Sequence, residues 1–421
     1  MFILETTSRR ADRKGGGKMR KRLAFFMMAL IVLAVFGGCY GRTCREPTAS
    51  TVVGQKGFYP SKQMKLKTQR GEFLQEAIKA PVSAAGLDPL NVLILSGGGQ
   101  NGAFGAGFLN GLTQRADPPD LNFDIVTGIS TGALQATFAF LGPDYYAMLE
   151  TFYSNLSQSD IFVNRLFPFL LWSDSLADPT PLRSLLENVI TLDIIEKVAR
   201  AHESGRRLFI GTVDLDSGDM IAWNMGEVAL GRNQQALEKY HDILMGASAV
   251  PVLLPPVEIE YITATGQLYE GLHVDGGLRE IVFFRHFMLD LRDTLRARDP
   301  LPDKDRLTII VNGKIGLGYN CTDAHWIPIA KRTLSTSLDE TAASGVLRAY
   351  LIACAEKMNF RLMRIPDDIE IDPLETTFNT ATMQMLIEKG KELALLEPIP
   401  YETSPPFAEY FVEICNQLGN Q

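Results

Sequence analysis

A serine set between glycines is the residue whose surroundings in this 421-residue chain best suit covalent chemistry. Residues 128–132 read "GISTG", which fits G-x-S-x-G, with the apolar run "FDIV" before them and "ALQATFAFL" after them. Such a serine, on a sharp turn from a strand into a helix, exposes its hydroxyl, and the glycines remove side chains that would crowd it. We therefore expect Ser130 to be a nucleophile for acyl transfer, at an elbow completed by Gly128 and Gly132. The alternative is a turn serine whose hydroxyl only caps the helix.

A glycine-rich loop comes one predicted strand earlier, in "LSGGGQNG" (residues 95–102). The spacing of its glycines fits the dinucleotide fingerprint G-x-G-x-x-G, but that site needs an acidic residue at the end of the second strand, which here ends in Gly128. No Lys-Ser/Thr pair follows the glycines, so the loop does not fit a P-loop either. Backbone N–H groups of Gly97, Gly98 and Gly99 could instead hold the oxyanion that forms when a serine attacks an ester. We expect these three residues to form an oxyanion hole.

A nucleophilic serine also needs a base, and Asp275 in "GLHVDGGL" is the strongest acidic candidate. This aspartate ends a predicted strand and precedes two glycines. That position places it at the carboxyl edge of a sheet, where folds of this kind carry their sites. An ordinary turn aspartate is the alternative, because Asp-Gly is a frequent turn pair.

The histidines leave a Ser-His-Asp triad open as a second interpretation. The chain contains His202, His241, His273, His286 and His325. His202 and His241 lie in charged helical stretches, where we expect surface positions. His286 and His325 are the candidate bases of a triad. His273 must be considered too, since it shares a strand face with the candidate acid two residues later.

Short apolar runs that alternate with helical patterns predict the fold that must position these groups. A mostly parallel sheet, covered by helices on both faces, is expected where strands are nearly continuous apolar runs separated by helices. The predicted strands are residues 91–96, 123–128, 207–215, 271–277 and 307–313. We expect the last 80 residues to be mainly helical, with residues 340–363 as one helix, and to extend the same domain.

The amino terminus has the layout of an export signal. A basic cluster at residues 18–22 precedes the apolar stretch 23–36 and the sequence Gly-Gly-Cys. The stretch is short for a membrane span, and a cysteine after two small residues resembles the lipobox of bacterial lipoproteins. We expect residues 1–38 to be a signal peptide of that type and Cys39 to be lipidated; an uncleaved anchor or an ordinary signal peptide are the alternatives.

The expected organisation is a polar tether, residues 39–85, that leads into one α/β hydrolase domain, residues 86–421. The lipid anchor predicts a location in the bacterial cell envelope, at the outer membrane and facing the periplasm. Removal of residues 1–38 leaves 33 Lys and Arg against 47 Asp and Glu, a formal charge of −14. Nucleic acid is therefore an unsuitable partner, because binding it depends on neutralising phosphates.

Cysteine spacing gives no reason to expect a metal or cofactor. Beyond Cys39 the cysteines are Cys44, Cys321, Cys354 and Cys415, without a C-x-x-C or Cys/His cluster. No acidic loop of the length that binds calcium occurs either. An exported protein could pair some of these cysteines, but their spacing does not say which.

Together, the glycine loop, G-x-S-x-G and D-G-G resemble the pattern of the patatin-like phospholipases, over about residues 90–365. "MGASAVPVLLPP" (245–256) is also similar to the A-S-x-A-x-P stretch of that family, with Val250 for the second alanine. The family loop is commonly D-G-G-G-x-R-G, whereas this chain has Ser96 and Asn101 for the aspartate and the arginine. A neutral Asn101 can still donate a hydrogen bond, but without charge assistance.

The resemblance implies a three-layer α/β/α fold and a Ser-Asp dyad that works without histidine. It would make Ser130 the nucleophile and Asp275 the base of an enzyme that cleaves lipid or phospholipid esters through an acyl-enzyme. A Ser-His-Asp esterase of the α/β-hydrolase class remains one alternative, and a non-catalytic lipid-binding lipoprotein remains another, since the family arginine is replaced. The apolar residues 161–172 could line an acyl channel or act as a lid, although core is the more common role of such a run.

Overall fold

The computed structural model describes residues 58–60, 89–165, 175–262, 268–284, 304–316, 321–371, 378–408, 411 and 415. The expected signal peptide, Cys39 and most of the expected tether lie outside these residues. Within that tether, Phe58–Pro60 forms strand β1. Over the described ranges, no helix combines the length and apolar character needed to cross a bilayer.

A nine-stranded sheet runs through the centre of the molecule in the order β1-β7-β6-β3-β2-β10-β11, with β9 and β8 attached beside β6. Its parallel strands are β2 (Asn91–Leu95), β3 (Ile125–Gly128), β6 (Arg207–Asp214), β10 (Arg306–Val311) and β11 (Asn359–Arg364). The antiparallel members are β1, β7 (Asp219–Asn224), β8 (Val257–Ile262) and β9 (Leu268–Asp275). Every residue of β2, β3 and β6 is buried, as expected for strands covered on both faces.

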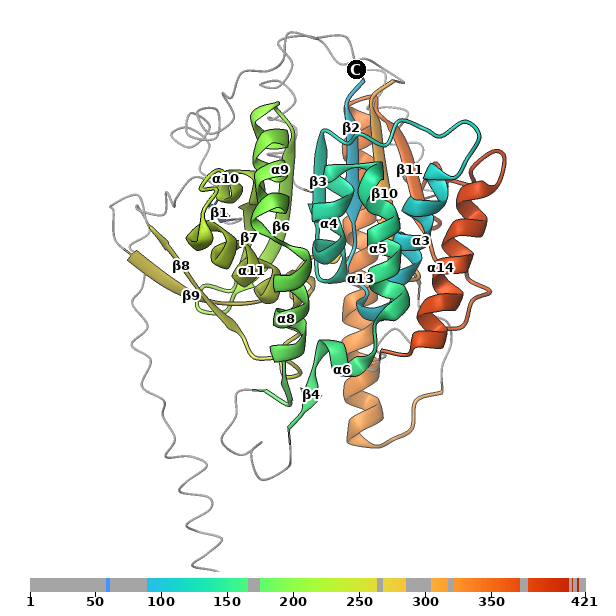
Figure 1. Cartoon of the computed structure of the whole chain (residues 1–421). Helices are drawn as coiled ribbons and strands as arrows, with labels where there is room; N and C mark the ends of the chain where they lie inside the picture. The colour runs from blue at the N-terminus through green and yellow to red at the C-terminus, as the bar shows by residue number, and fades with distance from the viewer. Residues whose placement is uncertain are drawn as a thin grey trace, which may run out of the picture.

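Helices cover both faces of this sheet, so the expected three-layer α/β/α sandwich with a mostly parallel sheet is confirmed (Figure 1). One face carries α3 (Gly102–Thr113), α4 (Thr131–Leu141), α5 (Tyr146–Asn155), α8 (Thr180–Val189), α9 (Leu192–Glu203), α10 (Met225–Ala229), α11 (Gln234–Ser248) and α14 (Thr380–Leu395). The other face is covered by α13 (Trp326–Ala355). The short elements α6 (Gln158–Ile161), β4 (Val163–Asn164) and β5 (Ala177–Asp178) lie at one end.

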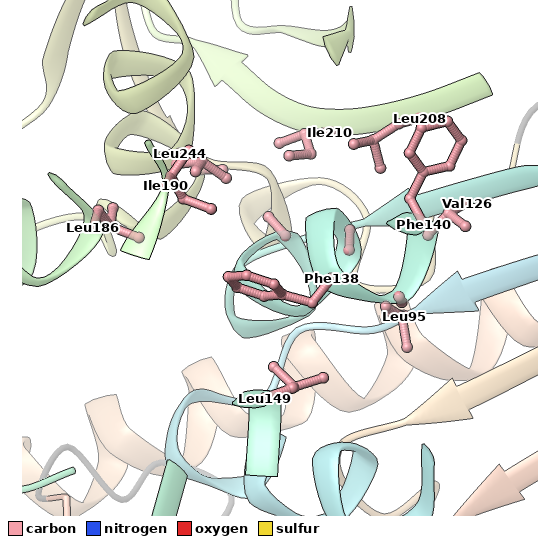
Figure 2. Close-up of a cluster of buried hydrophobic side chains, with 14 of the residues drawn as sticks. Leu95, Val126, Phe138, Phe140, Leu149, Leu186, Ile190, Leu208, Ile210 and Leu244 are labelled. Carbon is pink, nitrogen blue, oxygen red and sulfur yellow. The ribbon is translucent and has the colours of Figure 1, made fainter. Parts of the chain in front are cut away.

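Alternate residues of the strands divide the core between the two faces. Leu95, Val126 and Ile210 point toward the α4 side, where they pack with side chains such as Phe138 and Leu244 (Figure 2). The intervening strand residues face α13 instead. This period-two alternation is what a sheet between two helical layers requires.

The carboxyl-terminal part differs from the expected long helix. Helix α13 ends at Ala355 rather than running through to residue 363. Lys357 has a positive φ of 54°, which ends the helix, and β11 then pairs with β10 in parallel. An apolar run at the edge of the sheet gains a ladder of hydrogen bonds as well as burial, so the strand prevails over helical continuation.

The expected surface positions of two histidines are wrong. His202 on α9 is only 3% exposed, and its Nε2 lies 3.3 Å from the Glu227 carboxylate. His241 on α11 is 4% exposed and donates from Nε2 to the Ile190 carbonyl, 2.8 Å away. Both lie on the inward faces of helices whose other faces carry the charges, so a charged stretch did not imply an exposed histidine.

A disulfide joins Cys354, near the end of α13, to Cys415, with Cα atoms 5.3 Å apart. Cys321 is free and exposed. The pairing, which the spacing of the cysteines left open, closes a segment that contains β11 and α14.

Glycines allow α3 and α14 to pack at close range. A Cβ on Gly107 would overlap the backbone of Ile387, and one on Gly111 would lie 2.9 Å from the Cα of Lys391. Across the same contact, a Cβ on Gly390 would overlap the backbone of α3. The α3–α14 contact is therefore a backbone-to-backbone contact with no room for a methyl group.

We expect Gly107→Ala to lower the free energy of unfolding by about 1–3 kcal/mol, because the added methyl group must push α14 away. Alanine has the higher helix propensity, by about 1 kcal/mol, so any net loss reports the packing. Gly313→Ala is the matched control, since nothing lies within 4 Å of its Cβ position. Urea unfolding of both variants checks this, and equal stabilities would contradict it.

Candidate active site

Two strands meet end to end along one edge of β6 and bring the candidate groups together. Gly128, the last residue of β3, pairs with Ile210 of β6. Asp275, the last residue of β9, pairs with Thr212, two residues further along the same strand. Because β3 is parallel and β9 antiparallel to β6, their carboxyl ends point toward each other. Ser130 and Asp275 therefore converge at the same place on the sheet.

The Ser130 elbow has the strained backbone expected of an exposed nucleophile. Its φ is 54° and its ψ is −127°, a conformation that a residue with a side chain rarely adopts. A Cβ on Gly128 would overlap the carbonyl of Gly132, and one on Gly132 would overlap the carbonyls that end β2. The turn is thus sterically restricted to glycine on both sides of the serine. Ser130 precedes α4 without capping it through its hydroxyl, so the hydroxyl is available for another role.

Asp275 is buried beside Ser130, and the Ser130 hydroxyl is one of the groups that lower the pKa of its carboxyl. The aspartate is only 5% exposed; its Oδ1 also accepts from the Gly277 amide at 2.7 Å, and its own amide donates to the Ala249 carbonyl at 2.9 Å. Burial raises the pKa of Asp275 to about 6, although the Ser130 hydroxyl and the hydrogen bond from the Gly277 amide oppose that rise. Ser130 and Asp275 are thus neighbours, and with a pKa of about 6 the Asp275 carboxyl is mostly ionised at pH 7.

The glycine loop lies directly against the serine. A Cβ on Gly97 would be 3.2 Å from that of Ser130. The Gly97 amide already donates to the Ile281 carbonyl at 3.2 Å. Among the described residues, the amides of Gly98 and Gly99 have no acceptor, and these residues have positive φ values of 158° and 56°. The loop therefore offers two unused N–H donors, those of Gly98 and Gly99. Gly97, which has no side chain, lets the loop lie close to Ser130.

Asn312, which the sequence alone did not single out, holds the glycine loop in place through hydrogen bonds to both sides of the loop. It is fully buried; its backbone amide donates to the Ser96 hydroxyl at 2.8 Å, and its Nδ2 donates to the Ser96 carbonyl at 3.0 Å. Its Oδ1 accepts from the Gly105 amide at 3.2 Å. A Cβ on Gly98 would overlap the backbone of Asn312. Asn312 follows β10 directly, and a polar residue at the carboxyl end of a buried strand is the signal that could have identified it.

A second buried group ties the loop to the helix that follows the serine. Gln135 on α4 donates to the Gly102 carbonyl and accepts from Nδ2 of Asn312 at 3.3 Å. The Tyr153 hydroxyl on α5 bonds the Thr131 side chain, and burial raises the pKa of Tyr153 to about 12. These contacts connect the start of α3 to the start of α4, so the loop and the nucleophile keep a fixed relative position.

Asn101, which stands where the family pattern has arginine, is buried at the end of the glycine loop. It is 5% exposed, and its Oδ1 is buried without a hydrogen-bond partner among the described residues. Its neighbour Gln100 instead accepts from the Asn379 amide at 2.8 Å, which links the loop to the start of α14.

The described histidines occupy other roles. His273, two residues before Asp275 on β9, is fully buried; its Nδ1 lies 2.9 Å from Oγ1 of Thr212, which accepts from Nε1 of Trp223 at 2.8 Å. His325 is exposed at the start of α13, and His286 lies outside the described residues. Over the described ranges, His, Cys, Asp and Glu side chains form no cluster of three or more suited to a metal.

Comparison with known proteins agrees with this geometry. Residues 93–288 match the family model of the patatin-like phospholipases. Patatin-10 and patatin group M-3 of Solanum tuberosum are 22% and 23% identical to the chain over 369 residues, which cover 79% of this chain and 90% of each relative. The crystal structure of VipD from Legionella pneumophila aligns with a TM-score of 0.33 at 12% identity, over 75% of this chain and 73% of that one. Residues 93–288 therefore form a patatin-like phospholipase domain.

Proposed function

We propose that this lipid-ester hydrolase works through a dyad of Ser130 and Asp275, without a histidine. The observation that carries the proposal is the placement of the buried Asp275 carboxyl next to the Ser130 hydroxyl, at a strained elbow. Asp275 takes the serine proton as Oγ attacks the ester carbonyl, and the Gly98 and Gly99 amides stabilise the oxyanion.

Both half-reactions use the same carboxyl group. The protonated Asp275 gives its proton to the departing alcohol, which leaves the acyl group on Ser130. A water molecule then attacks the acyl-enzyme while Asp275 accepts a proton from it. The second tetrahedral intermediate collapses and releases the fatty acid, and the proton returns to the serine. Because one carboxyl serves as base and acid in turn, its pKa must lie near the working pH.

The amino-terminal interpretation remains part of the proposal. A signal peptide over residues 1–38 and lipidation at Cys39 would hold the enzyme at the outer membrane, with its site facing the periplasm. The disulfide between Cys354 and Cys415 supports a route through an oxidising compartment. The membrane would then be both the anchor and the source of the lipid substrate.

The dyad predicts that Ser130→Ala abolishes both hydrolysis of p-nitrophenyl butyrate and labelling by a fluorophosphonate. Asp275→Asn should lower the hydrolysis rate by about 10²–10⁴-fold, the range expected for loss of a general base. Esterase assays and gel detection of the label check these results.

Histidine variants distinguish the dyad from the two alternatives. Single replacement of His273, His286 or His325 should leave hydrolysis largely intact, whereas loss with one of them would support a triad esterase. An unlabelled Ser130 together with no hydrolysis of short esters or phospholipid would support the non-catalytic lipoprotein.

The pKa of Asp275 predicts how hydrolysis depends on pH. Its carboxyl must be ionised to accept the serine proton, and burial raises its pKa to about 6. We expect kcat/KM to fall about tenfold per pH unit below 6 and to be constant above about 7. A flat profile from pH 4 to 8 would contradict this role for the carboxyl.

The same shift has the opposite sign for stability. The folded pKa exceeds the ordinary value, so between about pH 4 and 6 the native state binds more protons than the unfolded chain, and stability is lost as pH rises. Asp275→Asn should therefore raise the free energy of unfolding at pH 8, by up to about 3 kcal/mol, and change it little below pH 4. Urea unfolding at both pH values gives the comparison.

The two donor glycines differ in the space around them. Gly98→Ala should lower hydrolysis at least about 100-fold, because the methyl group overlaps the Asn312 backbone and displaces the oxyanion hole. Gly99→Ala is the matched control: nothing lies within 4 Å of its Cβ position, and only the positive φ disfavours alanine. Its rate should stay within about tenfold of the parent's. Equal losses in both variants, with circular dichroism unchanged, would count against this assignment of the loop.

A further inference from the structure

We infer that a set of exposed apolar side chains beside the Ser130 site docks the protein onto the surface of a lipid bilayer. The surface, here named the apolar rim, consists of Val163, Leu176, Val250, Val252 and Leu278, of which Val252 is 70% exposed. The inference rests on the proposed function in that the bilayer supplies the substrate. It adds the surface through which the protein meets that bilayer.

Backbone hydrogen bonds join the separate segments of the apolar rim into one surface. Strands β4 and β5 pair so that Val163 and Leu176 lie on the same face of a small antiparallel ladder. The Leu176 amide then donates to the Val252 carbonyl at 2.9 Å, and the Ala177 amide donates to the Leu253 carbonyl at 3.0 Å. The turn at residues 250–254 is thereby attached to the ladder.

The apolar rim is continuous with the dyad. The Ala249 carbonyl, next to Val250, accepts from the Asp275 amide at 2.9 Å. Leu278 lies three residues after Asp275, in the short helix Gly276–Leu278. In Figure 1 the ladder at β4 lies at the lower end of the molecule, toward which the central parallel strands run. A lipid bilayer lying on the rim would lie beside the segments that carry Ser130 and Asp275.

Backbone strain marks Val252 as more than an incidental exposed residue. Its φ is 73°, a region that β-branched residues almost never occupy. The flanking hydrogen bonds hold the turn in this conformation, and the conformation presents the valine side chain to solvent. Strain maintained together with exposure of an apolar group is typical of a functional surface.

The charged groups around the apolar rim suit lipid headgroups. Arg165 and Arg279 are in or next to its segments; Arg279 donates to the Gly218 carbonyl, Arg165 lies near Asp178, and Asp178 accepts hydrogen bonds from Thr180. Arginine beside apolar side chains is the arrangement that lies well at a bilayer interface. A bilayer on the rim would bring lipid esters next to the segments that carry Ser130 and Asp275, which a second protein molecule would not do. These points favour the bilayer over a second copy of this chain.

The test measures binding to phosphatidylcholine vesicles by residues 40–421, which lack the expected signal peptide and Cys39 but contain every residue that the structure describes. Ser130→Ala is present in every binding sample, so that no lipid is hydrolysed. The rim variant combines Leu176→Gln with Val252→Asn, and asparagine tolerates a positive φ better than valine does. We expect the rim variant to need at least tenfold more lipid for half-maximal cosedimentation.

Leu395→Gln is the matched control for the rim variant. Leu395 is 48% exposed, as against 45% for Leu176, but it ends α14 on the same face of the sheet and next to the end of α3, where Arg115 donates to the neighbouring Ala394 carbonyl. This variant should bind vesicles within twofold of the parent. With Ser130 restored, the rim variant should hydrolyse soluble p-nitrophenyl butyrate within twofold of the parent but vesicle phosphatidylcholine at least tenfold more slowly.

Three results would overturn the inference: a parent protein that does not bind vesicles, a rim variant that binds as the parent does, or a dimeric parent that the rim variant makes monomeric. The last would assign the rim to a second copy of the chain. Failure of the proposed function is a distinct outcome, namely rim-dependent vesicle binding without hydrolysis of either ester.

Discussion

The whole site depends on β6 offering one edge to two strands that approach from opposite directions. The edge is long enough for β3 to pair with its first part and β9 with its last part, so the two strands end facing each other. A serine just beyond one end and an aspartate at the other are then held by main-chain ladders rather than by flexible side chains. Main-chain ladders give the dyad a precision that a loop would not provide.

Buried polar side chains hold the elements around Ser130 in a fixed relative position. Asn312 and Gln135 are fully buried, and their amide groups make hydrogen bonds that join β10, α3 and α4. A buried amide with satisfied hydrogen bonds rigidifies its surroundings, whereas an unsatisfied one is expensive. The strained turn at Ser130 lies next to these buried hydrogen bonds, which hold the residues around the turn in place.

Local motifs identified the candidate groups of the site, and long-range strand pairing determined how these groups meet. The elbow, the glycine loop and Asp275 each stand out within a few residues, and the apolar runs predict the sandwich. The contacts of Asn312 span 216 residues to Ser96 and 177 to Gln135, a separation that no periodicity encodes. Strand β11 was missed for a related reason: it follows α13 without a proline or glycine, and only its pairing with β10 makes it a strand.

The disulfide between Cys354 and Cys415 makes the free energy of unfolding depend on the redox state of the compartment in which the chain folds. It closes a loop of 61 residues, and loop closure of that length removes about 4 kcal/mol of chain entropy from the unfolded state at 25 °C. Most small domains are stable by only about 5–15 kcal/mol. A chain kept in a reducing compartment would therefore lack a sizeable part of its stability. The fully stable protein would form only where this thiol pair is oxidised.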